Sequence, residues 1–232
     1  MPDAICIAVV GAESTGKTTL AAALALQLAA QSGRRVAWVS EWLRDWCQHQ
    51  GRTPLAHEQA GILRAHHQRI EAAAATHDVV VCDTTALMTA VYSQLLFGDT
   101  SLHAEAAALH RRHQRLTLLT ALDLPWVADG LQRDGAHVRE PVDTALRELM
   151  IRHAIDFSVV GGAGARRLDQ ALAATAPLLR SADLSARPLG LFSALQTQNH
   201  GQTERPWRCE CCLPEEERAL RQRGRMGSPL PL

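Results

Sequence analysis

The chain has 232 residues, with 24 basic and 24 acidic side chains and a formal net charge of zero. Without a basic excess, we expect no electrostatic attraction to nucleic acid or to an anionic membrane. No apolar stretch reaches the roughly 18 residues of a membrane span, and the first residues carry no positive segment, so we expect no secretory signal.

Five short apolar runs predict buried strands over residues 5–10, 36–39, 79–82, 116–121 and 157–160. Helical patterns lie between and after these runs. The first predicted helix runs from Gly16 to Gly33, and the second passes through Trp42 and Trp46 and ends at Gly51. A long third helix has Thr53 as its N-cap and Pro54 as its first residue. Further helices are predicted over 86–97, over 101–113, from Pro141 onward, and over 166–179.

The predicted strands are continuously apolar and alternate with helices. This pattern is typical of a mostly parallel, five-stranded sheet that helices cover on both faces, a three-layer α/β/α fold. From residue 184 onward the pattern stops, and Pro, Gln, Gly and charged residues dominate. We therefore predict one domain over residues 1–183 and a tail or small appendage over 184–232.

Residues 11–18, Gly-Ala-Glu-Ser-Thr-Gly-Lys-Thr, match the phosphate-loop pattern G-x-x-x-x-G-K-[ST] between a predicted strand and a predicted helix. Backbone N–H groups and the helix N-terminus would hold phosphates, Lys17 would reach the β- and γ-phosphates, and Thr18 would hold Mg²⁺. Lys17 is the only lysine in the chain. The predicted nucleotide-binding residues are Gly11, Glu13, Ser14, Thr15, Gly16, Lys17, Thr18 and Thr19.

The class of phosphate-loop protein follows from what the sequence lacks. The only asparagine is Asn199 and there is no second lysine, so the Asn-Lys-x-Asp element for guanine is absent and ATP is favoured. No Leu-Ser-Gly-Gly-Gln signature occurs, and the chain is short for a ring ATPase. A kinase of the nucleoside or nucleotide type remains, which needs a second carboxylate, an acceptor pocket and a lid.

Asp83 ends the apolar run Val79–Cys82, which is the position of a Mg²⁺-binding carboxylate in such a sheet. The alternative is a helix N-cap aspartate. Glu41 and Arg44 share one face of the next predicted helix, where Glu41 would accept the proton of an acceptor hydroxyl and Arg44 would hold a phosphate or orient Glu41. An ordinary surface ion pair is the alternative for these two residues.

The segment 123–139 follows the fourth predicted strand, where kinases of this build carry a lid. Arg133 and Arg139 would close on the γ-phosphate; a solvated loop with surface arginines is the alternative. Gly161–Gly164, after the fifth strand, would shape the adenine pocket. Trp38, Trp42 and Trp46 recur every four residues, which is typical of a packing stripe, although an aromatic acceptor site is also compatible with them.

Four segments together resemble the ribosylnicotinamide kinase domain of NadR-type proteins. They are residues 11–19, Glu41–Trp46 (Glu-Trp-Leu-Arg-Asp-Trp), Asp83–Thr85 (Asp-Thr-Thr) and 125–131 (Pro-Trp-Val-Ala-Asp-Gly-Leu). The resemblance covers roughly residues 4–180 and implies a stand-alone kinase domain without the adenylyltransferase domain.

The resemblance implies transfer of the ATP γ-phosphate to the 5′-hydroxyl of nicotinamide riboside, with ATP and Mg²⁺ as cofactors. It places Lys17, Glu41, Asp83 and Arg133 in the catalytic site, Thr18 and Asp83 at the metal, and Glu41, Trp42, Arg44, Tyr92, Trp126 and Asp129 around the substrate. A kinase for another nucleoside-like acceptor, and an ATP-binding switch without a small-molecule acceptor, are the alternatives.

The tail contains three thiols in four residues, Cys209, Cys211 and Cys212, with His200 as a possible fourth zinc ligand. The spacing C-x-C-C is not that of a usual zinc knuckle, so a loosely docked tail is the alternative. The cysteines in predicted buried segments read as reduced residues, which favours a cytoplasmic location.

Overall fold

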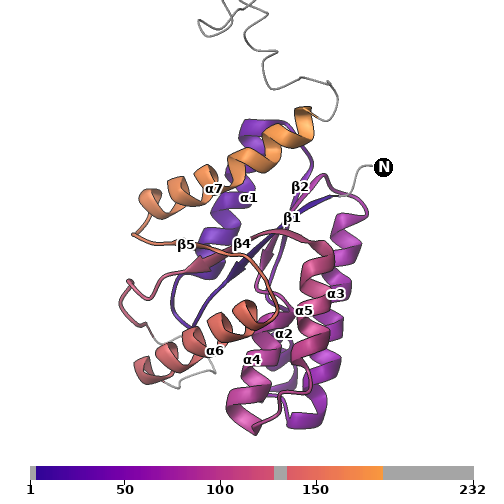
Figure 1. The fold of residues 1–232 in the computed structure, drawn as a ribbon, viewed down its shortest axis with the longest axis vertical. Helices are drawn as coiled ribbons and strands as arrows, with labels where there is room; N and C mark the ends of the chain where they lie inside the picture. The colour runs from indigo at the N-terminus through magenta and orange to yellow at the C-terminus, as the bar shows by residue number, and fades with distance from the viewer. Residues whose placement is uncertain (1–3, 128–134, 185–232) are drawn as a thin grey trace, which may run out of the picture. The chain divides into compact units, whose positions relative to one another are not determined.

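A computed structural model describes residues 4–127 and 135–184. Its centre is a five-stranded sheet in the order β2-β3-β1-β4-β5, and each of its four strand pairings is parallel (Figure 1). The strands are β1 (Ile5–Val10), β2 (Val36–Val39), β3 (Val79–Asp83), β4 (Gln114–Thr120) and β5 (Ser158–Val160). The predicted strand positions and the parallel sheet are confirmed.

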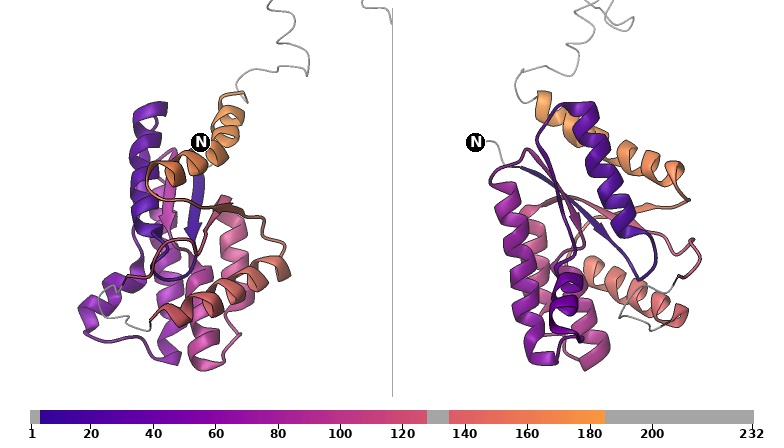
Figure 2. Two further views of the ribbon diagram at one scale, coloured as in Figure 1. Left: turned by 90° about the vertical axis from the view of Figure 1, so that its left-hand side faces the viewer. Right: turned by 180° about the vertical axis from the view of Figure 1, so that it is seen from behind.

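Helices cover both faces of the sheet, as Figures 1 and 2 show. One face carries α1 (Lys17–Ser32) and α7 (Ala165–Leu184). The other carries α2 (Trp42–Gln50), α3 (Gln59–Ala74), α4 (Ala86–Phe97), α5 (His103–His113) and α6 (Arg139–Arg152). Ile7 and Val9 of β1 belong to the core under α1 and α7, whereas Ala8 and Val10 belong to the core under α2–α6. This alternation follows from the two-residue period of a strand.

The predicted start of the third helix at Thr53 is wrong. Residues 53–55 have no regular secondary structure, a 3₁₀ turn follows over Ala56–Glu58, and α3 begins only at Gln59. The reason lies in Glu58, whose carboxylate accepts the Leu55 N–H at 2.8 Å and pairs with Arg52 at 2.7 Å. This local capping competes with the predicted Thr53 cap and delays the helix by about one and a half turns.

The carboxyl ends of β1, β3 and β4 lie side by side, because β1 pairs with both β3 and β4 in parallel. In an open parallel sheet, ligands bind outside these ends, at the point where successive strands diverge. Here that point collects the 11–16 turn, Asp83 and the segment after Thr120. A second 3₁₀ turn, Ala136–Val138, leads into α6.

Within residues 4–127 and 135–184, no helix has both the length and the apolar character of a membrane span. The predicted tail begins where α7 ends, and its thiols Cys209, Cys211 and Cys212 lie outside the described residues, as does His200. The domain boundary at residue 183 stays a prediction.

Candidate active site

The turn between β1 and α1 has the shape of a phosphate loop. Gly11 has a φ of 149° and Gly16 a φ of 77°, conformations that side-chain-bearing residues rarely adopt. A Cβ atom on Gly11 would lie 2.1 Å from Thr120 Oγ1. The loop therefore needs glycine at residue 11, both for its backbone angle and for its contact with β4.

Side chains of the loop hold it against β4 and against itself. Thr15 Oγ1 donates to the Ala12 carbonyl at 2.8 Å and lies 2.6 Å from Thr120 Oγ1. Lys17 Nζ donates to the same Ala12 carbonyl at 2.8 Å, and Lys17 is only 8% exposed. The lysine is thus folded over the loop, where an anion drawn in by the loop amides would meet it.

Arg167 of α7 also holds the loop in place, and no sequence pattern pointed to this residue. Its buried guanidinium donates to the Thr15 carbonyl and to the Asp123 carboxylate. Asp123 also accepts the Gly162 N–H at 2.5 Å. The residues that follow β1, β4 and β5 are therefore joined through one arginine and one aspartate.

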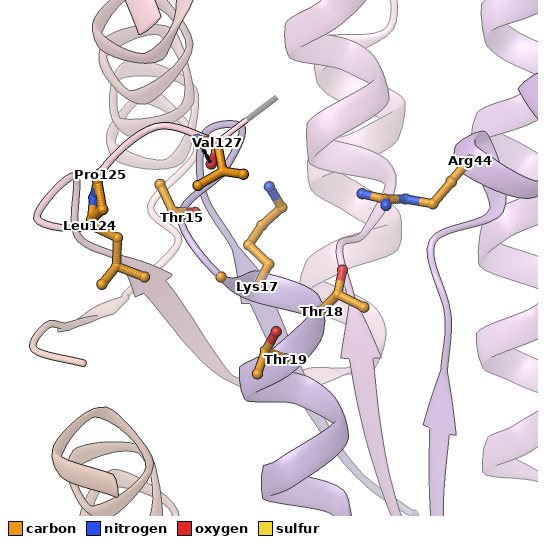
Figure 3. A pocket seen from close by; sticks show the side chains of 10 residues that line it. Thr15, Lys17, Thr18, Thr19, Arg44, Leu124, Pro125 and Val127 are labelled. Carbon is orange, nitrogen blue, oxygen red and sulfur yellow. Dashed lines mark hydrogen bonds between the residues drawn. The ribbon is translucent and has the colours of Figure 1, made fainter. Parts of the chain in front are cut away.

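A cavity of about 600 Å³ opens over the loop. In Figure 3 the ends of Lys17, Thr18 and Arg44 point into one space. Val127 lies over the loop and its N–H donates to Ser14 Oγ at 2.8 Å. The cavity is lined by Ser14, Thr15, Gly16, Lys17, Thr18, Thr19, Arg44, Leu124, Pro125 and Val127. A volume of this size is within the range of small-molecule sites.

Three acidic residues, Glu13, Glu41 and Asp83, form what we call the carboxylate cluster. Asp83 is 1% exposed, and neither of its oxygens makes a well-formed hydrogen bond in the described part of the chain. Burial raises the pKa of Asp83, while the adjacent Thr18 hydroxyl and the charges of Lys17 and Arg44 act in the opposite direction. An N-cap role for Asp83 is excluded, because Thr85 is the N-cap of α4.

Glu41 is the residue before α2, at its N-cap position. Burial raises its pKa, the Lys17 charge lowers it, and the charges of Asp83 and Glu13 raise it. One Glu41 oxygen lies 3.7 Å from Arg44 Nε, so the predicted ion pair exists. It is not an ordinary surface pair, because the Glu41 side chain is only 11% exposed.

Tyr92 of α4 lies beside Glu13 and Glu41 of the cluster. Its pKa is raised well above the usual value, first by burial and then by the charges of Glu13 and Glu41. A Glu13 oxygen is also buried without a hydrogen-bond partner among the described residues. The motif assigns Glu13 to the phosphate loop, whereas its charge acts on Tyr92 and Glu41.

The predicted aromatic residues have different surroundings. Trp42 packs under the Arg69 guanidinium at 4.8 Å from the ring centre, and Trp46 packs under Arg52 at 5.0 Å. Both indole rings also contact the core under α2–α6. Trp126 is partly buried, between two residues that line the cavity.

Two unforeseen residues support the cluster. Thr84 follows Asp83 with a φ of 68°, a strained backbone for a β-branched residue. His66 of α3 lies 3.3 Å from the Thr84 carbonyl through Nε2 and accepts the Trp42 N–H through Nδ1 at 3.1 Å. Burial lowers the His66 pKa to about 4. A neutral histidine therefore links the end of β3 to the start of α2.

The predicted lid is described only in part. Asp129 and Arg133 lie outside the described residues. Arg139 is buried and donates to the Leu124 carbonyl at 2.8 Å, while two of its other nitrogens have no partner in the described part of the chain. Arg139 thus holds the segment after β4 over the loop.

The family model for the AAA domain matches residues 6–167, well over half of the chain. The chain belongs to this AAA-domain family. No curated protein matches the AAA-domain chain.

Solved structures agree with this AAA domain in fold. A NadR protein in complex with NAD and AMP-PNP superposes with a TM-score of 0.61 at 16% identity, and a NadR protein in complex with NR superposes with a TM-score of 0.62 at 16% identity. They cover 76% and 75% of this chain, which spans only 50% of each NadR chain.

Thymidylate kinase from Ehrlichia chaffeensis superposes with a TM-score of 0.54 at 15% identity, over 77% of this chain and 100% of the kinase. The AAA domain therefore shares its fold with half of the NadR chain and with thymidylate kinase, and the expected resemblance to NadR is confirmed at the level of fold.

Proposed function

We propose that the protein is an ATP-dependent kinase that phosphorylates the 5′-hydroxyl of nicotinamide riboside to give nicotinamide mononucleotide. The γ-phosphate leaves ATP, the acceptor oxygen bonds to it, and ADP is released while the hydroxyl proton passes to a base. The nucleotide-side support is the 11–18 loop, whose amides, helix terminus and Lys17 suit a polyphosphate. The NadR structures with AMP-PNP and with NR have the same fold.

Thr18 and Asp83 fit a magnesium ion. Asp83 offers two buried oxygens without well-formed hydrogen bonds in the described chain, and a hydroxyl lies beside them, which are ligand types that Mg²⁺ prefers. When bound, the ion would neutralise charge on the β- and γ-phosphate oxygens. A buried carboxylate whose oxygens are incompletely hydrogen-bonded is costly in free energy, and a bound cation would offset this cost, which supports this role for Asp83.

The carboxylate cluster is the observation that carries the choice of acceptor. Glu13, Glu41 and Asp83 bring three acidic groups against the two cationic groups Lys17 and Arg44. A nucleoside monophosphate would bring further negative charge into this site. Nicotinamide riboside carries a positive charge on its ring nitrogen and hydroxyls on its ribose, and carboxylates suit both.

Individual roles follow from this arrangement. Glu41 accepts the proton of the acceptor hydroxyl or holds a ribose hydroxyl, and Arg44 orients it. Trp42, Tyr92 and Trp126 are the aromatic candidates beside the nicotinamide ring, and Asp129 is proposed to bind the acceptor from the lid. Arg133, aided by Arg139, is proposed to stabilise the charge that develops on the γ-phosphate. The adenine would lie near Gly161–Gly164.

The test is an acceptor panel with purified full chain and Mg²⁺-ATP. ADP release is measured without acceptor and with nicotinamide riboside, uridine, thymidine and thymidine monophosphate, each with the Lys17→Ala variant as the blank. We expect the largest stimulation with nicotinamide riboside. Stimulation by thymidine monophosphate alone would overturn the charge argument and favour the nucleotide-kinase alternative. Slow hydrolysis that no acceptor changes would favour an ATP-binding switch.

A further inference from the structure

A second cluster of titratable groups lies away from the phosphate loop. His67 and Glu71 are four residues apart on α3 and therefore share one face of the helix. His113 is the last residue of α5, immediately before β4 begins. The candidate ligand atoms of these three residues all lie within 4.8 Å of one another. We call this group the α3–α5 cluster.

The atoms of the cluster converge on a common point. One Glu71 oxygen lies 3.5 Å from His67 Nε2 and 3.3 Å from His113 Nε2. Two ligands that each bind a tetrahedral zinc ion at about 2.0–2.1 Å are about 3.3 Å apart, so two edges of the cluster already have this length. The two imidazole rings stand edge to face, with centres 4.9 Å apart.

Both histidine atoms are buried and available. The His67 side chain is 8% exposed, and neither His67 Nε2 nor His113 Nε2 makes a well-formed hydrogen bond within the described residues. Buried polar atoms normally have a partner, so two of them aimed at one carboxylate need an explanation.

We propose that His67, Glu71 and His113 bind a divalent transition-metal ion of the zinc class. Two imidazoles and one carboxylate form a ligand set that zinc accepts, and a water molecule completes four-coordination. Glu71 is 40% exposed, which gives an ion a route from solvent. The ion would join α3 to the start of β4.

The site differs in place from the candidate active site. α3 ends at Ala74, shortly before β3 begins, and His113 directly precedes β4. The cluster therefore lies at the edge where strands begin, whereas the phosphate loop lies where β1 ends. An ion bound there would hold the end of α3 against the end of α5, and its binding does not depend on the proposed kinase activity.

The test measures Zn²⁺ binding to the full chain with Cys209→Ser, Cys211→Ser and Cys212→Ser, because the tail thiols would compete for the metal. We expect one Zn²⁺ per chain and a rise in Tm with Zn²⁺. The Co²⁺ complex should show ligand-field bands without the sulfur-to-cobalt charge-transfer band that thiolate ligands give. In this background, Glu71→Gln and His113→Gln should each weaken Zn²⁺ binding by about 100-fold or more.

Glu148→Gln and His49→Gln are the matched controls, since both residues are exposed and lie outside the cluster. They should leave Zn²⁺ affinity unchanged. The Tm without Zn²⁺ shows whether each variant is folded. The rise in Tm on addition of Zn²⁺ reports binding, and a variant that is only less stable would keep this rise. No Zn²⁺ binding in the background that lacks the three tail thiols, or unchanged affinity in both folded cluster variants, would overturn the proposal. Neither result involves ATP or an acceptor.

Discussion

The phosphate loop and the carboxylate cluster are neighbours, since the Lys17 charge acts on both Asp83 and Glu41, but they are built differently. The loop keeps its shape through backbone angles at Gly11 and Gly16 and through bonds to Thr120 and Arg167. The cluster collects side chains from three separate segments, and the charges of Asp83 and Glu13 act unfavourably on Glu41. A backbone-built site is stable without its ligand, whereas a site of buried like charges stores unfavourable energy that a cationic ligand relieves.

Removal of the Lys17 ammonium should cause the largest loss of activity among these variants. Lys17→Ala should lower ADP release by about 1,000-fold, because the developing phosphate charge loses its only lysine partner. Circular dichroism and Tm check that the fold is kept. Lys17→Arg should restore little, since a planar guanidinium does not replace a compact ammonium at this position. Activity near the wild-type rate in Lys17→Ala would mean that Lys17 takes no part in phosphoryl transfer.

Neutralising Glu41 should separate activity from stability. Glu41→Gln should slow phosphoryl transfer by about 100-fold and leave ATP affinity unchanged. The folded pKa of Glu41 is raised, so the wild-type protein loses stability as pH rises through that pKa. Glu41→Gln should therefore raise Tm at pH 8 and give no such gain at pH 4.

Glu148→Gln, on the exposed side of α6, is the control for Glu41→Gln and should alter neither quantity. Wild-type transfer rates in Glu41→Gln would leave Glu41 outside the chemistry. A lower Tm at pH 8 would contradict the raised pKa of Glu41, whose first cause is burial.

Substitution of Gly11 tests the backbone construction of the loop. Gly11→Ala places a methyl group 2.1 Å from Thr120 Oγ1 and should cost about 3 kcal/mol of unfolding free energy. Gly98→Ala is the matched control, because Gly98 also has a positive φ but open space around it, and should cost about 1 kcal/mol. Urea denaturation measures both. Equal losses would mean that the contact with β4 adds nothing.

Acid should lower the unfolding free energy of the protein through protonation of His66, which links the end of β3 to the start of α2. Its folded pKa is about 4 against 6.5 for a free histidine, so the unfolded chain takes up the proton first and stability falls as pH drops from 6.5 towards 4. His66→Gln should remove about 2 kcal/mol of the stability change between pH 7.5 and pH 5. Urea unfolding at several pH values measures this, with His49→Gln as control. The same pH slope in wild type and His66→Gln would contradict it.

The sequence was sufficient for the fold and the loop because both depend on contiguous signals. The apolar runs located all five strands, and residues 11–18 carry a local motif. The start of α3 was predicted wrongly, because the bonds of Glu58 to Leu55 and Arg52 compete with a Thr53 cap that looked suitable by residue type alone.

The cluster was only partly predictable. Glu41, Asp83 and Tyr92 came from motifs and resemblance, but their shared surroundings with Glu13 depend on the strand order, which periodicity does not encode. Arg167 and His66 gave no signal at all. A single arginine on a late helix and one histidine on an amphipathic helix look like many others in the chain, and only the tertiary contacts distinguish them.

The most direct test of the account is the identity of the product formed from nicotinamide riboside and Mg²⁺-ATP by the wild-type chain, read by mass. The account predicts nicotinamide mononucleotide in a one-to-one ratio with ADP. ADP accompanied only by inorganic phosphate, with nicotinamide riboside recovered unchanged, would contradict the proposed transfer.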